Sequence, residues 1–265
     1  MQARRLPASR GWAWIVEGFA LFRRNPPLIT FLVVAYWFLL AAIGVFPLVG
    51  QVAAYLAMPA LSVGVANGCR AIDRGERGGF DLIFSGFRLN LPSLLRLGAI
   101  YLLATLAVFG ISALVDGGLL WQTMMKGQKV SLETFAESNL IAALKIALVL
   151  FMPVMLAYWF APLLAAWADM PAGKALFFSF FACMTNWRPF LVYGVGVMLI
   201  SAVVPGIILG AAAAVSESAI SLLSVVILLA LVFVFLPTLF ASFYTGARDI
   251  FVEFAPTPPR PARAD

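Results

Sequence analysis

Six long stretches of the chain are almost continuously apolar. They cover residues 28–47, 50–69, 93–115, 139–168, 190–214 and 221–245. A helix needs about 20 apolar residues to cross the hydrocarbon core of a bilayer, and each stretch reaches that length. Apolar residues run continuously instead of alternating with polar ones, which disfavours a β-barrel. The pattern therefore predicts an all-α integral membrane protein with six transmembrane helices, arranged as three helical hairpins.

The remaining residues are too few to form a sizeable soluble domain. Only 11% of the 265 residues are charged, against roughly 25% in soluble proteins. We expect a basic N-terminal tail at residues 1–10, a membrane domain at 11–254 and a disordered, proline-rich tail at 255–265. The first apolar stretch is long and is not followed by a small-residue cleavage site, so we interpret it as a retained span.

Basic residues collect on one side of the predicted membrane domain. Fifteen of the eighteen Lys and Arg residues lie in the four segments that six spans would place on that side. The opposite side holds only Lys126, Lys129 and Lys145. Because Lys and Arg accumulate in cytoplasmic loops, we predict a multi-pass protein of a bacterial inner membrane with both termini in the cytoplasm.

One sequence unit recurs three times along the chain. Each copy has an aromatic entry segment, then a break that contains Asn and Pro, then two spans. The breaks are Asn25-Pro26, Asn90-Leu91-Pro92 and Asn186-Trp187-Arg188-Pro189. Pro is tolerated in the first turn of a helix but not in its interior, so each break should end one helix and begin the next.

The second span of each unit carries a further shared mark, Pro-x-Leu, at Pro59, Pro162 and Pro237. In the first and third units the match extends to a glycine nine residues after the proline, an arginine eleven after it and an acidic residue beyond. These residues are Gly68, Arg70 and Asp73 in the first unit, and Gly246, Arg248 and Asp249 in the third. The extended match favours an internal triplication.

The entry segments are predicted to be short amphipathic helices in the membrane interface. In the second, an apolar stripe follows helical spacing and comprises Phe80, Ile83, Phe84, Phe87 and Leu91. In the first, the stripe is Trp12, Ile15, Val16, Phe19 and Phe22, with Trp14 and Leu21 outside it. Aromatic faces with basic residues nearby suit the head-group boundary of a bilayer. Ordinary connecting helices packed on the bundle would show the same pattern, and that alternative stays open.

Residues that catalysis or metal binding would need are scarce. The chain has no histidine, which removes the commonest general base and the commonest metal ligand. It also lacks a Cys-x-x-Cys pair, a Gly-x-x-x-x-Gly-Lys-Ser/Thr phosphate loop and a Gly-x-Ser-x-Gly elbow. We therefore expect no enzymatic activity, no cofactor and no metal.

The predicted spans are almost free of ionisable residues. Lys145 is the exception; it should extend toward the interface, and the alternative is a role in substrate binding or as a counter-charge. This scarcity counts against a proton- or sodium-coupled transporter. The pairs Gly64/Gly68 and Gly206/Gly210 lie one helical turn apart, which suits close packing within the chain or, alternatively, a homodimer.

The basic face suggests a binding function. We expect it to engage anionic lipid, or a membrane-protein partner, through arginines that hold phosphates or carboxylates and aromatic residues that enter the interface. These candidates are Arg23, Arg24, Arg74, Arg77, Arg88, Arg188, Trp12, Phe84, Phe87 and Phe181. The alternative is a small permease or lipid translocator with a cavity between the hairpin units. A nucleic-acid partner is not expected, because no binding fold for one is recognisable.

The N-terminal pattern resembles a known family. Gly11-Trp12-Ala13-Trp14-Ile15, Gly18-Phe19, Leu21-Phe22-Arg23 and Asn25-Pro26 resemble the start of an uncharacterised family of six-span proteobacterial inner-membrane proteins. The unit of entry segment and hairpin is also loosely similar to the membrane region of bacterial glycerophosphodiester phosphodiesterases, whose enzymatic domain is absent here. Neither resemblance implies particular functional residues.

Overall fold

The computed structural model describes residues 3–126, 139–213 and 216–254, which are helical and without β-strands. Six helices within these described ranges are long and apolar enough to cross a membrane. They are Pro26–Gly44, Val49–Asp73, Leu91–Asp116, Leu140–Trp167, Trp187–Ala213 and Ile220–Ile250. This confirms the predicted all-α membrane fold. The hairpin pairing, the triplication and the interfacial role of the entry segments stay predictions, and the proline-rich tail lies outside the described residues.

The described chain forms two compact units. Unit 1 takes in residues up to 41, residues 60–89 and residues from 182 onward; unit 2 takes in residues 42–59 and 90–181. The elements that lie wholly or mainly in unit 1 are α1 (Arg10–Arg24), α2 (Pro26–Gly44), the 3-10 helix η1 (Phe80–Arg88), α10 (Trp187–Met198), the π-helical η2 (Leu199–Val203), α11 (Val204–Ala213), α12 (Glu217–Ala230), the π-helical η3 (Leu231–Phe235), α13 (Leu236–Ile250) and η4 (Val252–Phe254). Helix α3 (Val49–Asp73) passes from unit 2 into unit 1.

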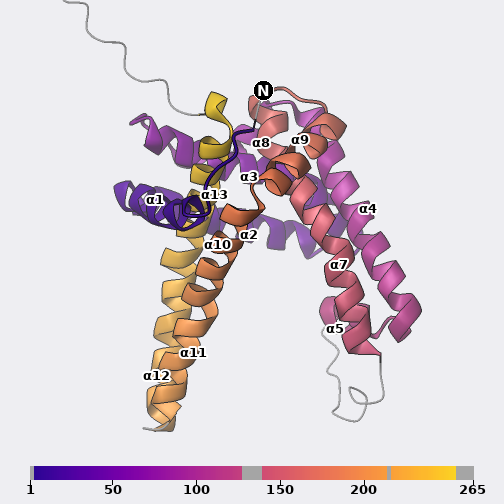
Figure 1. Cartoon of the computed structure of the whole chain (residues 1–265), viewed down its shortest axis with the longest axis vertical. Helices are drawn as coiled ribbons and strands as arrows, with labels where there is room; N and C mark the ends of the chain where they lie inside the picture. Colours follow the sequence, from indigo (N-terminus) through magenta and orange to yellow (C-terminus); the bar gives the residue numbers. More distant parts are fainter. Residues whose placement is uncertain (1–2, 127–138, 214–215, 255–265) are drawn as a thin grey trace, which may run out of the picture. The chain divides into compact units, whose positions relative to one another are not determined.

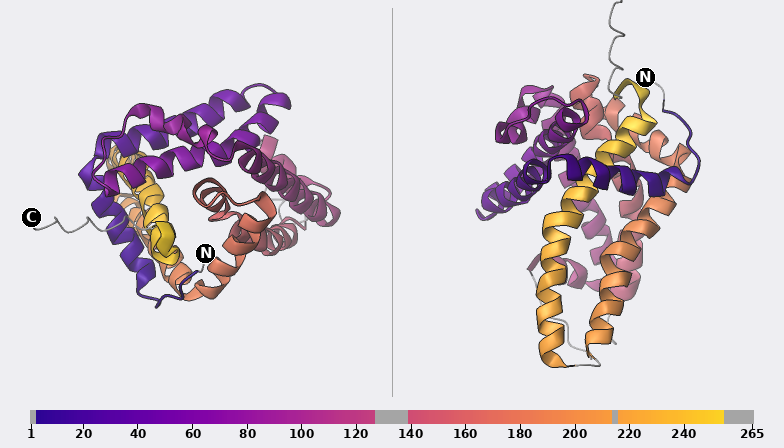
Figure 2. Two further views of the ribbon diagram at one scale, coloured as in Figure 1. Left: turned by 90° about the horizontal axis from the view of Figure 1, so that it is seen from above. Right: turned by 90° about the vertical axis from the view of Figure 1, so that its left-hand side faces the viewer.

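Helix α1 lies across α10 and α13 within unit 1 (Figure 2). Two glycines allow the close approach. A β-carbon built at Gly11 would overlap the carbonyl oxygen of Pro189, and one at Gly18 would lie 2.6 Å from the Cα of Ser242. Residues seven apart are about two helical turns apart and share a face. The Gly11 and Gly18 spacing therefore sets where α1 crosses its two neighbours.

Trp14 fills the space between these three helices. It is buried, and its ring meets Phe190 and Tyr193 of α10 edge to face, with centroids 5.4 and 6.0 Å away. Thr245 of α13 donates a hydrogen bond to its backbone carbonyl at 3.2 Å. Trp14 lay outside the predicted apolar stripe, because α1 has two apolar faces. One packs on α10 and α13, and the other is exposed.

The exposed apolar face of α1 carries Trp12, Val16 and Phe19. Its buried face carries Trp14 and Leu21. The predicted stripe mixed residues of both faces, because helical spacing alone does not separate a face that packs on protein from one that is left open.

The three Asn/Pro breaks separate helices, and their asparagines have distinct contacts. Asn25 lies between α1 and α2. Asn90 adopts a left-handed conformation, with φ 41°, and its side chain donates to two carbonyls of unit 2. Asn186 is buried, accepts the N–H of Leu6 at 2.9 Å and donates to the carbonyl of Arg4 at 2.9 Å. An asparagine offers both a donor and an acceptor, so one side chain satisfies both kinds of backbone group.

A widened helical turn precedes a proline in each of the last two spans. The π-helical segments η2 and η3 are followed at once by Pro205 and Pro237. Pro237 has no N–H to give to the carbonyl of Phe233, four residues earlier. Thr30 of α2 donates its hydroxyl to that carbonyl at 3.3 Å. The proline thus frees an acceptor that ties α2 to η3.

In unit 2, α4 (Leu91–Asp116) packs against α7 (Leu140–Tyr158) (Figure 1). Tyr101 of α4 stacks on Tyr158 of α7, with ring centroids 4.5 Å apart. The short helix α5 (Leu119–Lys126) follows α4. The fourth span, Leu140–Trp167, is interrupted near its end, where α7 stops at Tyr158 and α8 (Ala161–Trp167) begins. Ser179 of α9 (Ala172–Thr185) accepts the N–H of Phe160 at 2.9 Å and so satisfies the backbone at this interruption.

We expect Gly18→Ala to destabilise the protein, because its β-carbon would meet the backbone of Ser242, which cannot move aside as a side chain can. Overpacking of this kind costs about 1–3 kcal/mol. Gly194→Ala in α10 is the matched control, since nothing lies within 4 Å of a β-carbon there, and removing a helical glycine stabilises by roughly 0.5–1 kcal/mol. The apparent melting temperature in detergent, followed by tryptophan fluorescence, should fall for Gly18→Ala only. An equal response from both variants would contradict the crossing.

Candidate functional site

A network of charged side chains joins α1 to the ends of α3 and α13. Arg10 donates to Asp249 at 2.6 Å and to Glu17 at 2.8 Å. Arg248 donates to Asp73 at 2.7 Å and to Glu17 at 3.1 Å. Glu17 therefore bridges two arginines that lie far apart in the sequence. Burial alone would lower the pKa of Arg10, but hydrogen bonds and attraction from Asp249 and Glu17 raise it above its ordinary value.

Asp73 is the most buried acid of this network, with a side chain only 7% exposed. It accepts a hydrogen bond from the hydroxyl of Tyr244 at 2.9 Å as well as the bond from Arg248. Arg24 approaches its other oxygen at 3.6 Å, from a side chain that is 58% exposed. Arg24 is thus held much more loosely than Arg248.

The acidic side chains near α1 form ion pairs within this network. Glu17, Asp73 and Asp249 are each in contact with an arginine of unit 1. Other arginines are left at the surface. Within the described residues no ion pair to an acidic side chain is formed by Arg23, Arg77, Arg88 or Arg188, all of which are exposed.

Two of these exposed arginines lie over aromatic rings. The guanidinium of Arg23 is 5.8 Å from the ring centre of Phe19, and that of Arg188 is 5.5 Å from the ring centre of Trp187. Arg74 comes within 3.9 Å of Glu76, and both are in solvent-accessible positions. Such exposed contacts hold a side chain weakly.

The structure distributes the predicted site residues over several elements. In unit 1, Trp12, Arg23 and Arg24 lie on α1, Phe84, Phe87 and Arg88 on η1, Arg188 on α10, and Arg74 and Arg77 between α3 and η1. Phe181 lies on α9 in unit 2. Nine of the ten candidates therefore belong to one unit.

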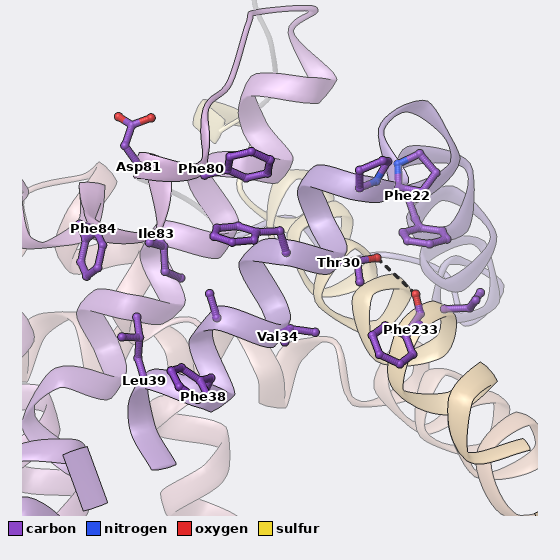
Figure 3. A pocket seen from close by; sticks show the side chains of 15 residues that line it. Phe22, Thr30, Val34, Phe38, Leu39, Phe80, Asp81, Ile83, Phe84 and Phe233 are labelled. Atoms are coloured by element: carbon purple, nitrogen blue, oxygen red, sulfur yellow. Dashed lines mark hydrogen bonds between the residues drawn. The ribbon is translucent and has the colours of Figure 1, made fainter. Parts of the chain in front are cut away.

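An apolar groove of about 1180 Å³, called here the α2 groove, runs beside α2 in unit 1 (Figure 3). Its lining comes from α2, η1, η3 and the C-terminal end of α1. The lining residues are Phe22, Pro26, Pro27, Thr30, Phe31, Val34, Ala35, Phe38, Leu39, Phe80, Asp81, Ile83, Phe84, Phe233 and Val234. Helix α2 runs obliquely to α12 and α13 (Figures 1 and 2) and meets η3 through the Thr30 bond, which leaves the space beside it open.

A second apolar groove, about 480 Å³ in volume, lies under the exposed face of α1. It is lined by Trp12, Ile15, Val16, Phe19, Ile200, Pro205, Ile227, Ala230, Leu231, Val234, Phe235 and Thr238. Val234 of η3 lines both grooves. The widened turn of η3 therefore forms the wall between them.

The acidic half of this site did not follow from the sequence patterns. Asp73, Arg248 and Asp249 were recognised only as members of a repeated pattern, and Glu17 was not singled out. Acidic residues in segments otherwise rich in arginine are the signal that indicates internal ion pairs. As for metals, the described ranges hold no group of three or more Cys, Asp or Glu residues that would bind an ion.

Comparisons with known proteins give one clear relative. The chain is 32% identical, over 98% of its own length and 97% of the relative's, to a protein of Burkholderia thailandensis named as a probable inner membrane protein. No family model matches the chain. No solved structure matches it either. The looser resemblance to the membrane region of glycerophosphodiester phosphodiesterases finds no support in these comparisons.

We predict that Asp73→Ala destabilises the protein, because it leaves Arg248 and Tyr244 without their shared acceptor. Breaking a buried ion pair costs about 3–5 kcal/mol. Because Arg248 is partly exposed, the loss of stability here should be about 3 kcal/mol or less. Glu76→Ala is the control, since its contact with Arg74 is long and exposed. Thermal unfolding in detergent should separate the two variants clearly. Similar melting temperatures for both would show that the network does not hold α1, α3 and α13 together.

Proposed function

Because this chain belongs to the family of the probable inner membrane protein of Burkholderia thailandensis, we propose that it is an inner-membrane protein whose exposed arginines hold anionic phospholipid head groups. In this proposal both termini lie in the cytoplasm and the protein is not an enzyme. Phospholipid is the partner that every inner-membrane protein meets, and the anionic lipids carry the phosphate charge that arginine binds well.

The observation that carries the proposal is the division of arginines into two classes. The arginines of one class, Arg10 and Arg248, form ion pairs with acidic side chains inside the protein. The arginines of the other class are exposed; the clearest are Arg77, which precedes the aromatic segment η1, and Arg88, its last residue. Arginine without an internal acid partner is free to pair bidentately with a phosphate.

Aromatic side chains next to these arginines support the same function. Phe80 and Phe84 of η1 are 59% and 50% exposed, although both are large and apolar. Aromatic side chains beside basic ones are favoured where head groups meet acyl chains. The alternative, a small permease or lipid translocator, would need a transport path. The apolar lining of the two grooves favours hydrocarbon over a polar solute as the occupant.

We predict that Arg74→Glu/Arg77→Glu/Arg88→Glu abolishes a preference for phosphatidylglycerol over phosphatidylcholine. A basic residue near an anionic surface contributes about 1 kcal/mol, so three reversals should lower that preference at least tenfold. The measurement is native mass spectrometry of lipids retained after extraction from nanodiscs that contain both lipids equally. The variant with lysine at the same three positions keeps the charge and should keep most of the preference. Unchanged retention in the glutamate variant would refute the proposal.

The proposed orientation makes a separate prediction. Green fluorescent protein fused after residue 265 should fluoresce in bacterial cells, because it folds in the cytoplasm, whereas alkaline phosphatase fused there should stay inactive. Inserted between α4 and α7, after residue 126, alkaline phosphatase should be active. The reverse pattern of activities would place the basic face outside and rule the orientation out.

A further inference from the structure

The α2 groove differs from an ordinary exposed helix face in its volume of about 1180 Å³ and in its two ends. It is lined almost wholly by apolar side chains along nearly four turns of α2, from Pro26 to Leu39. The rise of an α-helix over those residues is about 20 Å. One leaflet of a bilayer has a hydrocarbon depth of about 15 Å, half of the full core. The groove therefore has the length scale of one extended acyl chain.

The two ends of the groove differ in polarity. At the Pro26 end, Arg23 and Arg24 lie in the sequence between the lining residues Phe22 and Pro26 and are exposed. At the other end the lining is formed by Phe38 and Leu39 (Figure 3). A site that is cationic at one end and apolar at the other complements an amphiphile with an anionic head and a hydrocarbon tail.

The polar groups of the lining do not oppose a hydrocarbon occupant. Thr30 donates its hydroxyl hydrogen to the carbonyl of Phe233. Asp81 points away from the apolar side chains, as Figure 3 shows. The aromatic rings of Phe31 and Phe80, with centroids 4.4 Å apart, form a continuous wall across α2 and η1.

Arg24 is the cation best able to reach a head group. It approaches Asp73 only at 3.6 Å, while Asp73 is already bound by Arg248 at 2.7 Å and by Tyr244 at 2.9 Å. A swing of Arg24 toward a phosphate thus leaves the acid satisfied.

We propose that the α2 groove binds one acyl chain of a phospholipid whose phosphate is held by Arg23 and Arg24. A groove inside a membrane-spanning segment is surrounded by hydrocarbon, so a lipid chain is the occupant with direct access to it. The phosphate contact in this inference rests on the proposed function, whereas the acyl-chain contact does not. Binding here would make one lipid a stoichiometric component of the protein, distinct from the lipids that exchange around its surface.

The test uses a phospholipid with a photoreactive diazirine in its acyl chain, incorporated in nanodiscs with the full-length protein. After illumination, peptide mapping should find cross-links concentrated on Phe31, Val34 and Phe38. Ala35→Trp fills the groove and should reduce those cross-links at least fivefold, along with the single-lipid adduct in native mass spectra. Leu103→Trp is the control, because Leu103 of α4 is exposed and outside the groove.

Each outcome of this test decides between the two proposals. Cross-links spread evenly over α2 and α4, or a groove occupied by a second copy of the chain, would overturn the acyl-chain site. If Ala35→Trp does not fold, the cross-link positions in the unaltered protein still decide. Groove cross-links that persist after reversal of Arg74, Arg77 and Arg88, with no head-group preference in either protein, would uphold the groove and reject the proposed function.

Discussion

The ion-pair network of Arg10, Glu17, Asp73, Arg248 and Asp249 is the interaction on which the rest of unit 1 depends. It links three helices that come from the beginning, the first third and the end of the chain. Charges beside an apolar bundle are costly unless they are paired and hydrogen-bonded. Here each acid has at least one arginine within hydrogen-bonding distance, so the network specifies which helices meet and where.

The network also determines what the protein presents to its surroundings. The acids near α1 are already paired within the network. Arg77, Arg88 and Arg188 are exposed and have no acidic partner in the described part of the chain. By holding α1 across α10 and α13, the network keeps Trp12 and Phe19 over an apolar groove. The proposed binding surface and the framework thus both follow from one charge arrangement.

Much of the fold was accessible from sequence, because membrane insertion makes simple demands on length and polarity. Six apolar stretches predicted six helices, and the Asn/Pro breaks predicted where α1, η1 and α9 end. The site was less accessible. The approach of α1 to α13 depends on Gly18 and Ser242, which lie more than 200 residues apart, and no periodicity within one segment encodes such a contact. Likewise, Thr30 donates a hydrogen bond to the carbonyl of Phe233, four residues before Pro237. This bond could be predicted only if the neighbours of each helix were already known.

We proposed that paired arginines hold helices together and that exposed arginines bind anionic lipid. Varying the salt concentration tests this difference most directly. Salt screens exposed charges strongly and partly buried pairs far less. The preference for phosphatidylglycerol over phosphatidylcholine and the apparent melting temperature should therefore be measured on one protein sample from low salt to about 1 M. The account predicts that the lipid preference is lost while the melting temperature stays nearly constant. A parallel fall of both, or a lipid preference that does not respond to salt, would contradict it.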